Sequence, residues 1–284
     1  MPELSILLPV RNAESTIKSA VVSTLRAMPQ DAELVIFDDG STDSTGLILG
    51  EIGDKRLRVL ESPNSAGGGV ANALNELLRH TDSDFVARMD ADDICIPHRF
   101  WLQRRQIDRS ESQILFGTVV HFGAGFPVPR PSIPARISPE AMRIALLISN
   151  PVAHSTLYGR RQVIEEAGGY RPGPAEDYEL WLRLSSSGVP IERGGTPVLA
   201  YRHHVKQVTA GSNWQREVHS DPSLNRAYVH CLNSVLGLNL DTHATSLQQS
   251  QYRTELELQI SHLESQKDRR YLTRYMRGKF SISS

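Results

Sequence analysis

The chain has 284 residues, of which 39% are hydrophobic and 22% are charged, as in an ordinary globular protein of one large domain or slightly more. Its formal net charge of −1 provides no general attraction to polyanions, so we expect no nucleic-acid partner. The two cysteines, Cys95 and Cys231, lie far apart and lack the spacing of a metal site, which argues against a disulfide scaffold and for a reducing compartment.

The first residues of the chain do not resemble a signal peptide, because no basic segment precedes a long apolar one. No stretch approaches the roughly 20 apolar residues of a membrane span. We therefore expect a cytoplasmic protein and leave open a peripheral contact with the inner face of the membrane.

Strand and helix patterns alternate through the first hundred residues. Apolar runs predict strands over 4–10, 33–37, 57–60 and 85–89. Helical patterns follow each strand, ending near 27, 50, 80 and 107. Regular alternation predicts βαβ units, and hence an α/β fold with a mostly parallel sheet. Ligands bind at the carboxyl ends of such strands, where the polar motifs of this chain also fall.

The alternation stops at about residue 111. We expect a strand over 113–122, a Pro- and Gly-rich loop over 123–134, helices over 139–148 and 175–186, and a short extended segment ending at 201–204. From about 214 the chain is polar with a helical pattern. The predicted organisation is a first half over 1–110, a second half over 111–213 and a helical extension over 214–284.

Three carboxylates, Asp90, Asp92 and Asp93, crowd the end of the fourth predicted strand. Side chains alternate along an extended strand, so Asp90 and Asp92 can face the same way. Such a pair suits a hard divalent cation that also binds phosphate oxygens. The alternative is an acidic turn that caps the following helix.

A second pair of acids, Asp38 and Asp39, ends the second predicted strand. An Asp-Gly turn with Ser41 or Thr42 capping a helix accounts for the residues that follow, but not for two adjacent acids. A carboxylate at this position can accept hydrogen bonds from a nucleobase or a ribose hydroxyl.

Three further motifs are ambiguous when taken alone. Glu176-Asp177 lies where a helix starts after Pro174, and acids are favoured there by the helix dipole. His203-His204 can be ordinary packing histidines or can include a metal ligand. The glycines of 64–72 do not form a dinucleotide fingerprint, because Asn72 occupies the third glycine position and the segment follows the third strand.

In this order the motifs resemble glycosyltransferase family 2, the GT-A nucleotide-sugar transferases, over roughly residues 3–210. Residues 5–14 are similar to the opening strand and turn of the family, with Arg11 where Tyr is more usual. The other resembling segments are 38–43 (nucleotide-binding motif), 64–72, 87–93 (metal motif), 150–156, 168–170, 176–181 (Glu-Asp motif) and 201–204.

The resemblance implies a GT-A-type, mostly parallel sheet flanked by helices, with a nucleotide-sugar-binding half (1–110), an acceptor-binding half (111–213) and a helical C-terminal extension (214–284). It implies transfer of a sugar from a nucleoside-diphosphate donor to a hydroxyl of a saccharide or lipid-linked acceptor, usually with inversion, in polysaccharide or glycoconjugate biosynthesis. Asp177 is then the general base with Glu176 as second choice, and Asp90, Asp92 and His204 hold Mn²⁺ or Mg²⁺. The implied donor contacts are Pro9, Val10, Arg11, Glu14, Asp38, Asp39, Asn64, Gly67, Arg88, Asp90 and Ala91.

Two other functions stay open from the sequence. A nucleotide-binding oxidoreductase would bind its cofactor at Gly67–Gly69, but it leaves Asp90-Ala91-Asp92 unexplained. A catalytically inert relative would bind a sugar nucleotide for assembly or regulation, and the intact Asp177 argues against it without excluding it.

The C-terminal tail has an amphipathic pattern. Tyr271 with Tyr275, and Leu272 with Met276, lie four residues apart and form an apolar stripe flanked by arginines. Such a helix can lie on an anionic membrane. The interpretation we favour is packing on the catalytic domain or on a second subunit, which leaves a homo-oligomer open.

Overall fold

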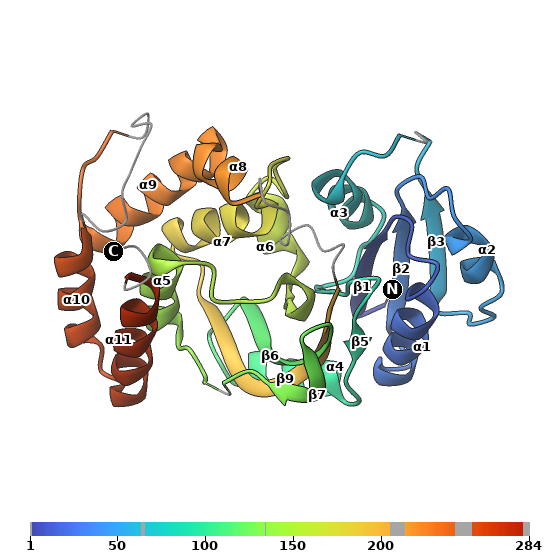
Figure 1. Ribbon diagram of the computed structural model, residues 1–284, viewed down its shortest axis with the longest axis horizontal. Helices are drawn as coiled ribbons and strands as arrows, with labels where there is room; N and C mark the ends of the chain where they lie inside the picture. Colours follow the sequence, from blue (N-terminus) through green and yellow to red (C-terminus); the bar gives the residue numbers. More distant parts are fainter. Residues whose placement is uncertain (1, 64–65, 134, 205–213, 242–251, 281–284) are drawn as a thin grey trace.

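The computed structural model describes residues 2–63, 66–133, 135–204, 214–241 and 252–280. A curved sheet runs through the molecule, with the N-terminal strands at one end and the C-terminal helices at the other (Figure 1). The strand order is β3-β2-β1-β4-β8-β6-β9-β5, and β7 pairs with β6 beside this path.

The first half of the sheet is parallel, as the alternating pattern predicts. It consists of β1 (Leu4–Val10), β2 (Glu33–Asp38), β3 (Leu57–Glu61) and β4 (Phe85–Arg88). The helices that connect these strands are α1 (Ile17–Ala27), α2 (Thr45–Gly50) and α3 (Val70–Arg79). The central strand β1 is buried on both faces, which explains why its sequence is apolar apart from Ser5.

The second half of the sheet is mixed. It contains β5 (Ile94–Cys95), β6 (Ile114–Gly123), β7 (Phe126–Pro131), β8 (Tyr158–Arg160) and β9 (Ile191–His203). β6 runs parallel to β9 and antiparallel to β7 and β8. Two predictions are wrong here: the expected loop over 123–134 contains β7, and the short extended segment is a 13-residue strand, β9.

Helices cover both faces of the sheet. One apolar cluster includes α1 and α4 (Arg99–Ile107), and the other includes α3, α5 (Pro139–Ile148) and α7 (Glu176–Ser186). Between α5 and α7 lie the 3-10 turn η1 (His154–Thr156) and α6 (Arg161–Glu166). The predicted α/β class is confirmed, whereas the division at residues 110 and 213 stays a prediction.

The C-terminal extension is helical, as predicted. It consists of α8 (Trp214–Ser220), α9 (Pro222–Leu236), α10 (Arg253–His262) and α11 (Gln266–Phe280). Leu272 and Met276 are buried in the cluster that contains α5, so the apolar stripe of the tail packs on the same chain. Among the described residues, no helix is both long and apolar enough to cross a membrane.

Candidate functional site

The register of β1 with its two neighbours brings the predicted site residues to one edge of the sheet. Val10 pairs with Asp38 on β2, and Leu7 pairs with Arg88 on β4. Asp39 donates its backbone N–H to the carbonyl of Val10 at 2.9 Å. The ends of β1, β2 and β4 therefore lie side by side, as expected for the carboxyl edge of a parallel sheet.

Asp39 anchors the glycine loop that precedes α3. Its two carboxylate oxygens accept hydrogen bonds from the backbone N–H groups of Gly68 and Gly69, each at 2.8 Å. Gly67 has a φ of +77°, and a methyl group there would lie 2.6 Å from Nη1 of Arg11. Arg11, Asp39 and Gly67, three of the predicted donor contacts, therefore form one cluster.

Hydrogen bonds around Asp38 connect the loop that follows β1 with the loop that follows β2. Asp38 accepts from the N–H of Ser41 at 2.8 Å, and Ser41 Oγ accepts from the N–H of Asn12 at 2.9 Å. Glu14 accepts from the N–H of Ser44 at 3.0 Å. Because α2 begins only at Thr45 and has no side-chain cap bond, the alternative of helix capping by Ser41 or Thr42 is wrong.

Asp90, Asp92 and Asp93 form an acidic cluster in which one oxygen of each carboxylate lies within 4.8 Å of the others. The capping alternative is wrong here as well, because β5 follows the cluster and α4 begins at Arg99. The sequence analysis did not choose Asp93 as a ligand, although it lies in the same motif.

Asp93 is the most buried member of this cluster, with 1% of its surface exposed. Its Oδ1 accepts from the N–H of Arg202 at 2.8 Å, and the hydroxyl of Ser155 interacts with the same carboxylate, but among the described residues Oδ2 makes no hydrogen bond of ordinary geometry. Burial, together with the charges of Asp90 and Asp92, raises the pKa of Asp93 well above its ordinary value. A buried carboxylate oxygen without a partner is costly unless a cation or a proton compensates it.

Two cationic or ionisable side chains contact the other two carboxylates. Arg88 forms two contacts with Asp90, at 2.8 and 2.6 Å, and is itself buried. His204 Nε2 lies 2.8 Å from Oδ2 of Asp92. The structure therefore brings together Arg88, Asp90, Asp92 and His204, which sequence reasoning assigned to the diphosphate and the metal.

Glu176 and Asp177 form the first turn of α7, so the helix-start interpretation is correct. Asp177 Oδ2 accepts from Nδ2 of Asn150 at 3.0 Å. Burial and the neighbouring Asp177 raise the pKa of Glu176 to about 7, and burial also raises the pKa of Asp177. Asp177 interacts electrostatically with Arg88 and with Asp90, so α7 starts next to the acidic cluster.

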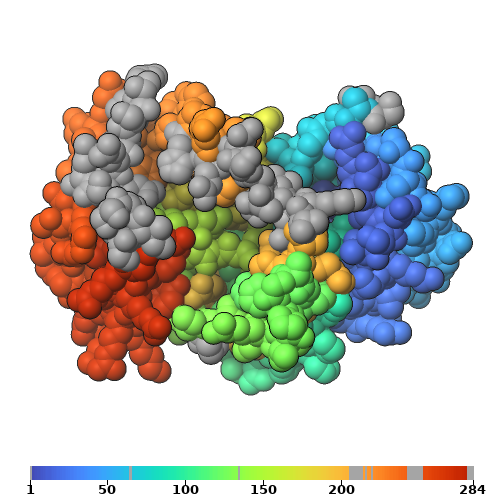
Figure 2. Space-filling model, viewed as in Figure 1, coloured from blue at the N-terminus to red at the C-terminus, as the bar shows by residue number. Residues whose placement is uncertain are grey.

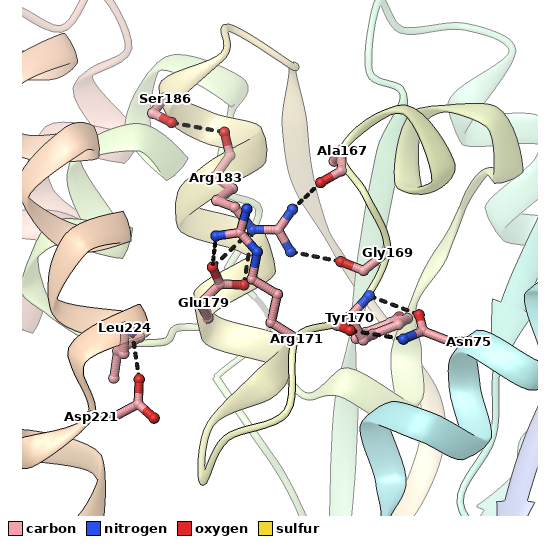
Figure 3. A network of polar contacts seen from close by, with 10 residues as sticks. All are labelled: Asn75, Ala167, Gly169, Tyr170, Arg171, Glu179, Arg183, Ser186, Asp221 and Leu224. Carbon is pink, nitrogen blue, oxygen red and sulfur yellow. Dashed lines mark hydrogen bonds and ion pairs between the residues drawn. The ribbon is translucent and has the colours of Figure 1, made fainter.

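A loop between α6 and α7 fixes this arrangement (Figure 3). Asn75 of α3 accepts from the N–H of Tyr170 and donates to its carbonyl, at 2.9 and 2.8 Å. Arg183 of α7 donates to the carbonyl of Gly169 at 2.6 Å and also binds Glu179 through both carboxylate oxygens. The loop thus connects α3 of the first half with α7 of the second.

The hydroxyl of Tyr170 lies 3.0 Å from Nε2 of buried His154. Burial and the nearby Arg88 lower the pKa of His154 well below its ordinary value, which keeps the imidazole neutral at pH 7. Sequence reasoning gave no separate role to Asn150, His154 or Tyr170, although all three lie within the resembling segments.

The remaining predicted donor contacts differ in their exposure. Pro9 and Ala91 are half-buried, and Glu14 is exposed. Val10 is buried in the apolar core, so only its backbone can face a ligand. Asn64 lies outside the described residues.

Comparison with known proteins agrees with this geometry. The chain is 29% identical over 182 residues to the amylovoran biosynthesis glycosyltransferase AmsE of Erwinia amylovora, over 63% of this chain and 66% of AmsE. It is 32% identical over 114 residues to the Escherichia coli UDP-Glc:alpha-D-GlcNAc-diphosphoundecaprenol beta-1,3-glucosyltransferase WfgD, over 40% of this chain and 44% of WfgD. The chain thus covers less than two thirds of either relative.

The fold is similar to that of S. aureus TarS 1–349, solved in complex with UDP-GlcNAc. The TM-score is 0.66 at 18% identity, covering 92% of this chain and 72% of that one. Residues 5–168, more than half of the chain, match the profile of glycosyl transferase family 2. The chain therefore belongs to glycosyltransferase family 2.

Proposed function

We propose that this protein transfers a sugar from a nucleoside-diphosphate donor to a hydroxyl of a lipid-linked saccharide, with inversion, in polysaccharide or glycoconjugate biosynthesis. The observation that carries the proposal is the position of the first turn of α7 beside the acidic cluster at the end of β4. Chemistry of this kind needs a proton acceptor near the site that binds the leaving diphosphate.

The names of relatives support the classes of substrate. WfgD is named for UDP-Glc and for a diphosphoundecaprenol-linked acceptor, and TarS was solved with UDP-GlcNAc. AmsE is named for the biosynthesis of a polysaccharide. We therefore propose a UDP-sugar as donor and a lipid-linked saccharide as acceptor.

Donor binding is assigned to the ends of β1, β2 and β4. Asp38 and Asp39 would accept hydrogen bonds from the base and ribose, and the loop at Gly67 would allow close approach of the backbone. Arg88 would contact the diphosphate next to Asp90 and Ala91. The contacts of Asp39 with Gly68 and Gly69 support this, because they fix the loop against the strand end before the donor binds.

The residues at the acidic cluster fit a divalent cation. Carboxylate oxygens from Asp90, Asp92 and Asp93, with the imidazole of His204, would hold Mn²⁺ or Mg²⁺. The burial of Asp93, whose Oδ2 makes no hydrogen bond of ordinary geometry among the described residues, supports this fit. When bound, such a cation offsets the negative charge that develops on the departing diphosphate.

Asp177 is proposed as the general base. Its carboxylate would take the proton of the acceptor hydroxyl as the hydroxyl oxygen attacks the anomeric carbon, with Asn150 fixing the orientation of Oδ2. Glu176 stays the second candidate, since its pKa of about 7 also suits a proton acceptor.

Two variants test the assignment. Asp177→Asn keeps the size of the side chain but cannot take a proton, so UDP release from the preferred UDP-sugar should fall by about 100-fold or more while UDP binding is retained. Asp92→Asn should lose the Mn²⁺-dependent part of UDP affinity in calorimetry, whereas Asp108→Asn, at the exposed C-cap of α4, should keep it. If wild-type protein binds UDP but turns over no UDP-sugar with any saccharide acceptor, the inert alternative is correct.

We further propose that α11 contacts an anionic membrane surface, which would suit a lipid-linked acceptor. Lys267, Arg270, Arg274 and Arg277 are exposed and spaced three, four and three residues apart, so they form one stripe along the helix. Figure 2 shows α10 and α11 on the outer surface at the end opposite the N-terminal half. Basic residues on one helix face favour anionic lipid.

A further inference from the structure

Helix α11 contacts the segment that carries Asn150. Tyr275 and Ser149 share a hydrogen bond between their hydroxyl groups, across 126 positions of sequence. Ser149 is the C-cap of α5 and has an extended backbone, so Asn150 is the next residue as the chain leaves the helix. The hydroxyl of Tyr275 therefore holds the residue directly before Asn150.

A second contact from α11 reaches the residue after Asn150. The guanidinium of Arg193 lies 5.2 Å from the ring centroid of Tyr271 and donates to its hydroxyl at 3.1 Å. The same guanidinium donates to the carbonyl of Pro151 at 2.7 Å. Tyr271 and Tyr275 are stacked, with centroids 5.7 Å apart, so the two contacts form one unit.

The tyrosine hydroxyls are not needed to dock the helix. Leu272 and Met276 are 0% and 2% exposed and provide the apolar contact with the core. The hydroxyl of Tyr275 instead binds Ser149, and that of Tyr271 binds Arg193, which in turn binds Pro151, so the two contacts flank Asn150. Nδ2 of Asn150 donates to Oδ2 of Asp177. Both bonds of the tyrosine hydroxyls are partly buried, and a hydrogen bond of this kind adds little to stability, so we attribute to them a role in geometry.

We propose that α11 positions the general base: Tyr275 through Ser149, and Tyr271 through Arg193 and Pro151, hold Asn150 so that it keeps Asp177 oriented toward the acceptor hydroxyl. The inference rests on the proposed role of Asp177. Tyr275 and Tyr271 are positioning residues, because neither touches a reacting atom. Helix α11, which lies beyond residues 5–168 that match the family profile, would thereby position the base for catalysis.

Kinetics on the full chain test this inference. Tyr275→Phe, Asn150→Ala and the double variant are compared by UDP release from UDP-glucose and UDP-GlcNAc in the presence of Mn²⁺. Tyr228→Phe is the matched control, because its hydroxyl also binds α5, at the carbonyl of Leu147, but does not hold Ser149. Ser149→Ala removes the same bond as Tyr275→Phe from the other side and replaces that variant if it does not fold.

Tyr275→Phe should lower kcat roughly fivefold, the loss of one hydrogen bond, with KM for the donor unchanged. In the Asn150→Ala background, Tyr275→Phe should cause no further loss of kcat, because both changes remove the same positioning of Asp177. Tyr228→Phe should keep the wild-type kcat. Equal kcat values for Tyr275→Phe and Tyr228→Phe, or losses that multiply in the double variant, would overturn the inference.

Asp177→Asn separates this inference from the proposed function. If that variant retains turnover, Asp177 is not the base, so the assignment of the base and the role of α11 both fail, whereas sugar transfer itself stands with Glu176 as the candidate base. If the wild type turns over no UDP-sugar, the proposed function fails. If Asp177→Asn abolishes turnover while Tyr275→Phe behaves as the control does, the proposed function stands and the role of α11 is wrong.

Discussion

Glu176 and Asp177 are adjacent carboxylates in a partly buried turn, and this has a consequence for stability. Burial and the charge of Asp177 raise the pKa of Glu176 from 4.5 to about 7 in the folded protein. Between these values the folded state binds more protons than the unfolded state. The free energy of unfolding should therefore decrease as the pH rises through this interval.

The Glu176→Gln variant removes this dependence. It should match the wild type near pH 4 and exceed it at pH 8, by at most about 3 kcal/mol. Urea unfolding at several pH values measures the difference. A stability difference that stays constant from pH 5 to pH 8 would contradict the raised pKa.

Gly67 and Gly69 provide a second test at the scale of single residues. Both have positive φ values, +77° and +83°, so both resist substitution by alanine. Only at Gly67 would a methyl group collide with neighbours, at 2.6 Å from Arg11 and 2.8 Å from the carbonyl oxygen of Asp39.

We expect Gly67→Ala to weaken UDP binding by about 1–3 kcal/mol more than Gly69→Ala, because crowding displaces Arg11 and Asp39. Calorimetric titration with UDP compares the two. Since the backbone strain is similar, equal losses would mean that the cluster of Arg11, Asp39 and Gly67 does not contribute to the donor site.

Among the helices, α7 is held by the buried carboxylate of Glu179, which forms ion pairs with two arginines of unequal exposure (Figure 3). Glu179 is 3% exposed and binds both Arg183 and Arg171. The side chain of Arg183 is 12% exposed, whereas that of Arg171 is 52% exposed. Arg183 also reaches the carbonyls of Ala167 and Gly169 in the loop before α7.

Arg183→Met should therefore destabilise the protein by about 3 kcal/mol or more, because it leaves a buried carboxylate with only one exposed partner. Arg171→Met is the matched control and should cost about 1 kcal/mol or less. Urea denaturation of both variants checks the ranking. Similar losses of unfolding free energy in the two variants would show that burial of the Glu179–Arg183 ion pair does not determine the stability of α7.

For the whole molecule, the position of α11 predicts a separation between membrane binding and catalysis. Replacing Lys267, Arg270 and Arg274 by glutamine should abolish sedimentation with vesicles containing phosphatidylglycerol, at an unchanged rate of UDP-sugar hydrolysis. Replacing the exposed Lys18, Arg26 and Lys55 by glutamine changes the net charge equally and should leave sedimentation intact. Binding that persists in the first variant would remove α11 as the membrane contact.

Much of the fold could be predicted from the sequence because it depends on local patterns. Continuous apolar runs bounded by turns identified β1 to β4, and Ser138-Pro139 marks the start of α5 with a side-chain cap. β5, β7 and β8 escaped prediction, because β5 and β8 have only two and three residues and β7 is rich in proline and mostly exposed.

The site was predictable where its residues are neighbours in the sequence. Asp90 and Asp92 could be paired from the alternation along one strand. His204 lies 112 positions from Asp92 and could be assigned to the same site only through the resemblance to the family, and nothing predicted the bond between Tyr275 and Ser149, which spans 126 positions. Contacts of this kind depend on how helices and strands pack, which no local pattern encodes.

The length of β9 has a consequence for the order in which the protein is made. This strand ends at His203. Nε2 of the next residue, His204, contacts Oδ2 of Asp92, and the backbone N–H of Arg202 donates to Oδ1 of Asp93. A ribosome synthesises the three carboxylates long before it adds these partners. Until residue 204 has emerged from the ribosome, a nascent chain carries the acidic cluster without the strand that closes it, so donor hydrolysis should begin only after synthesis has passed β9.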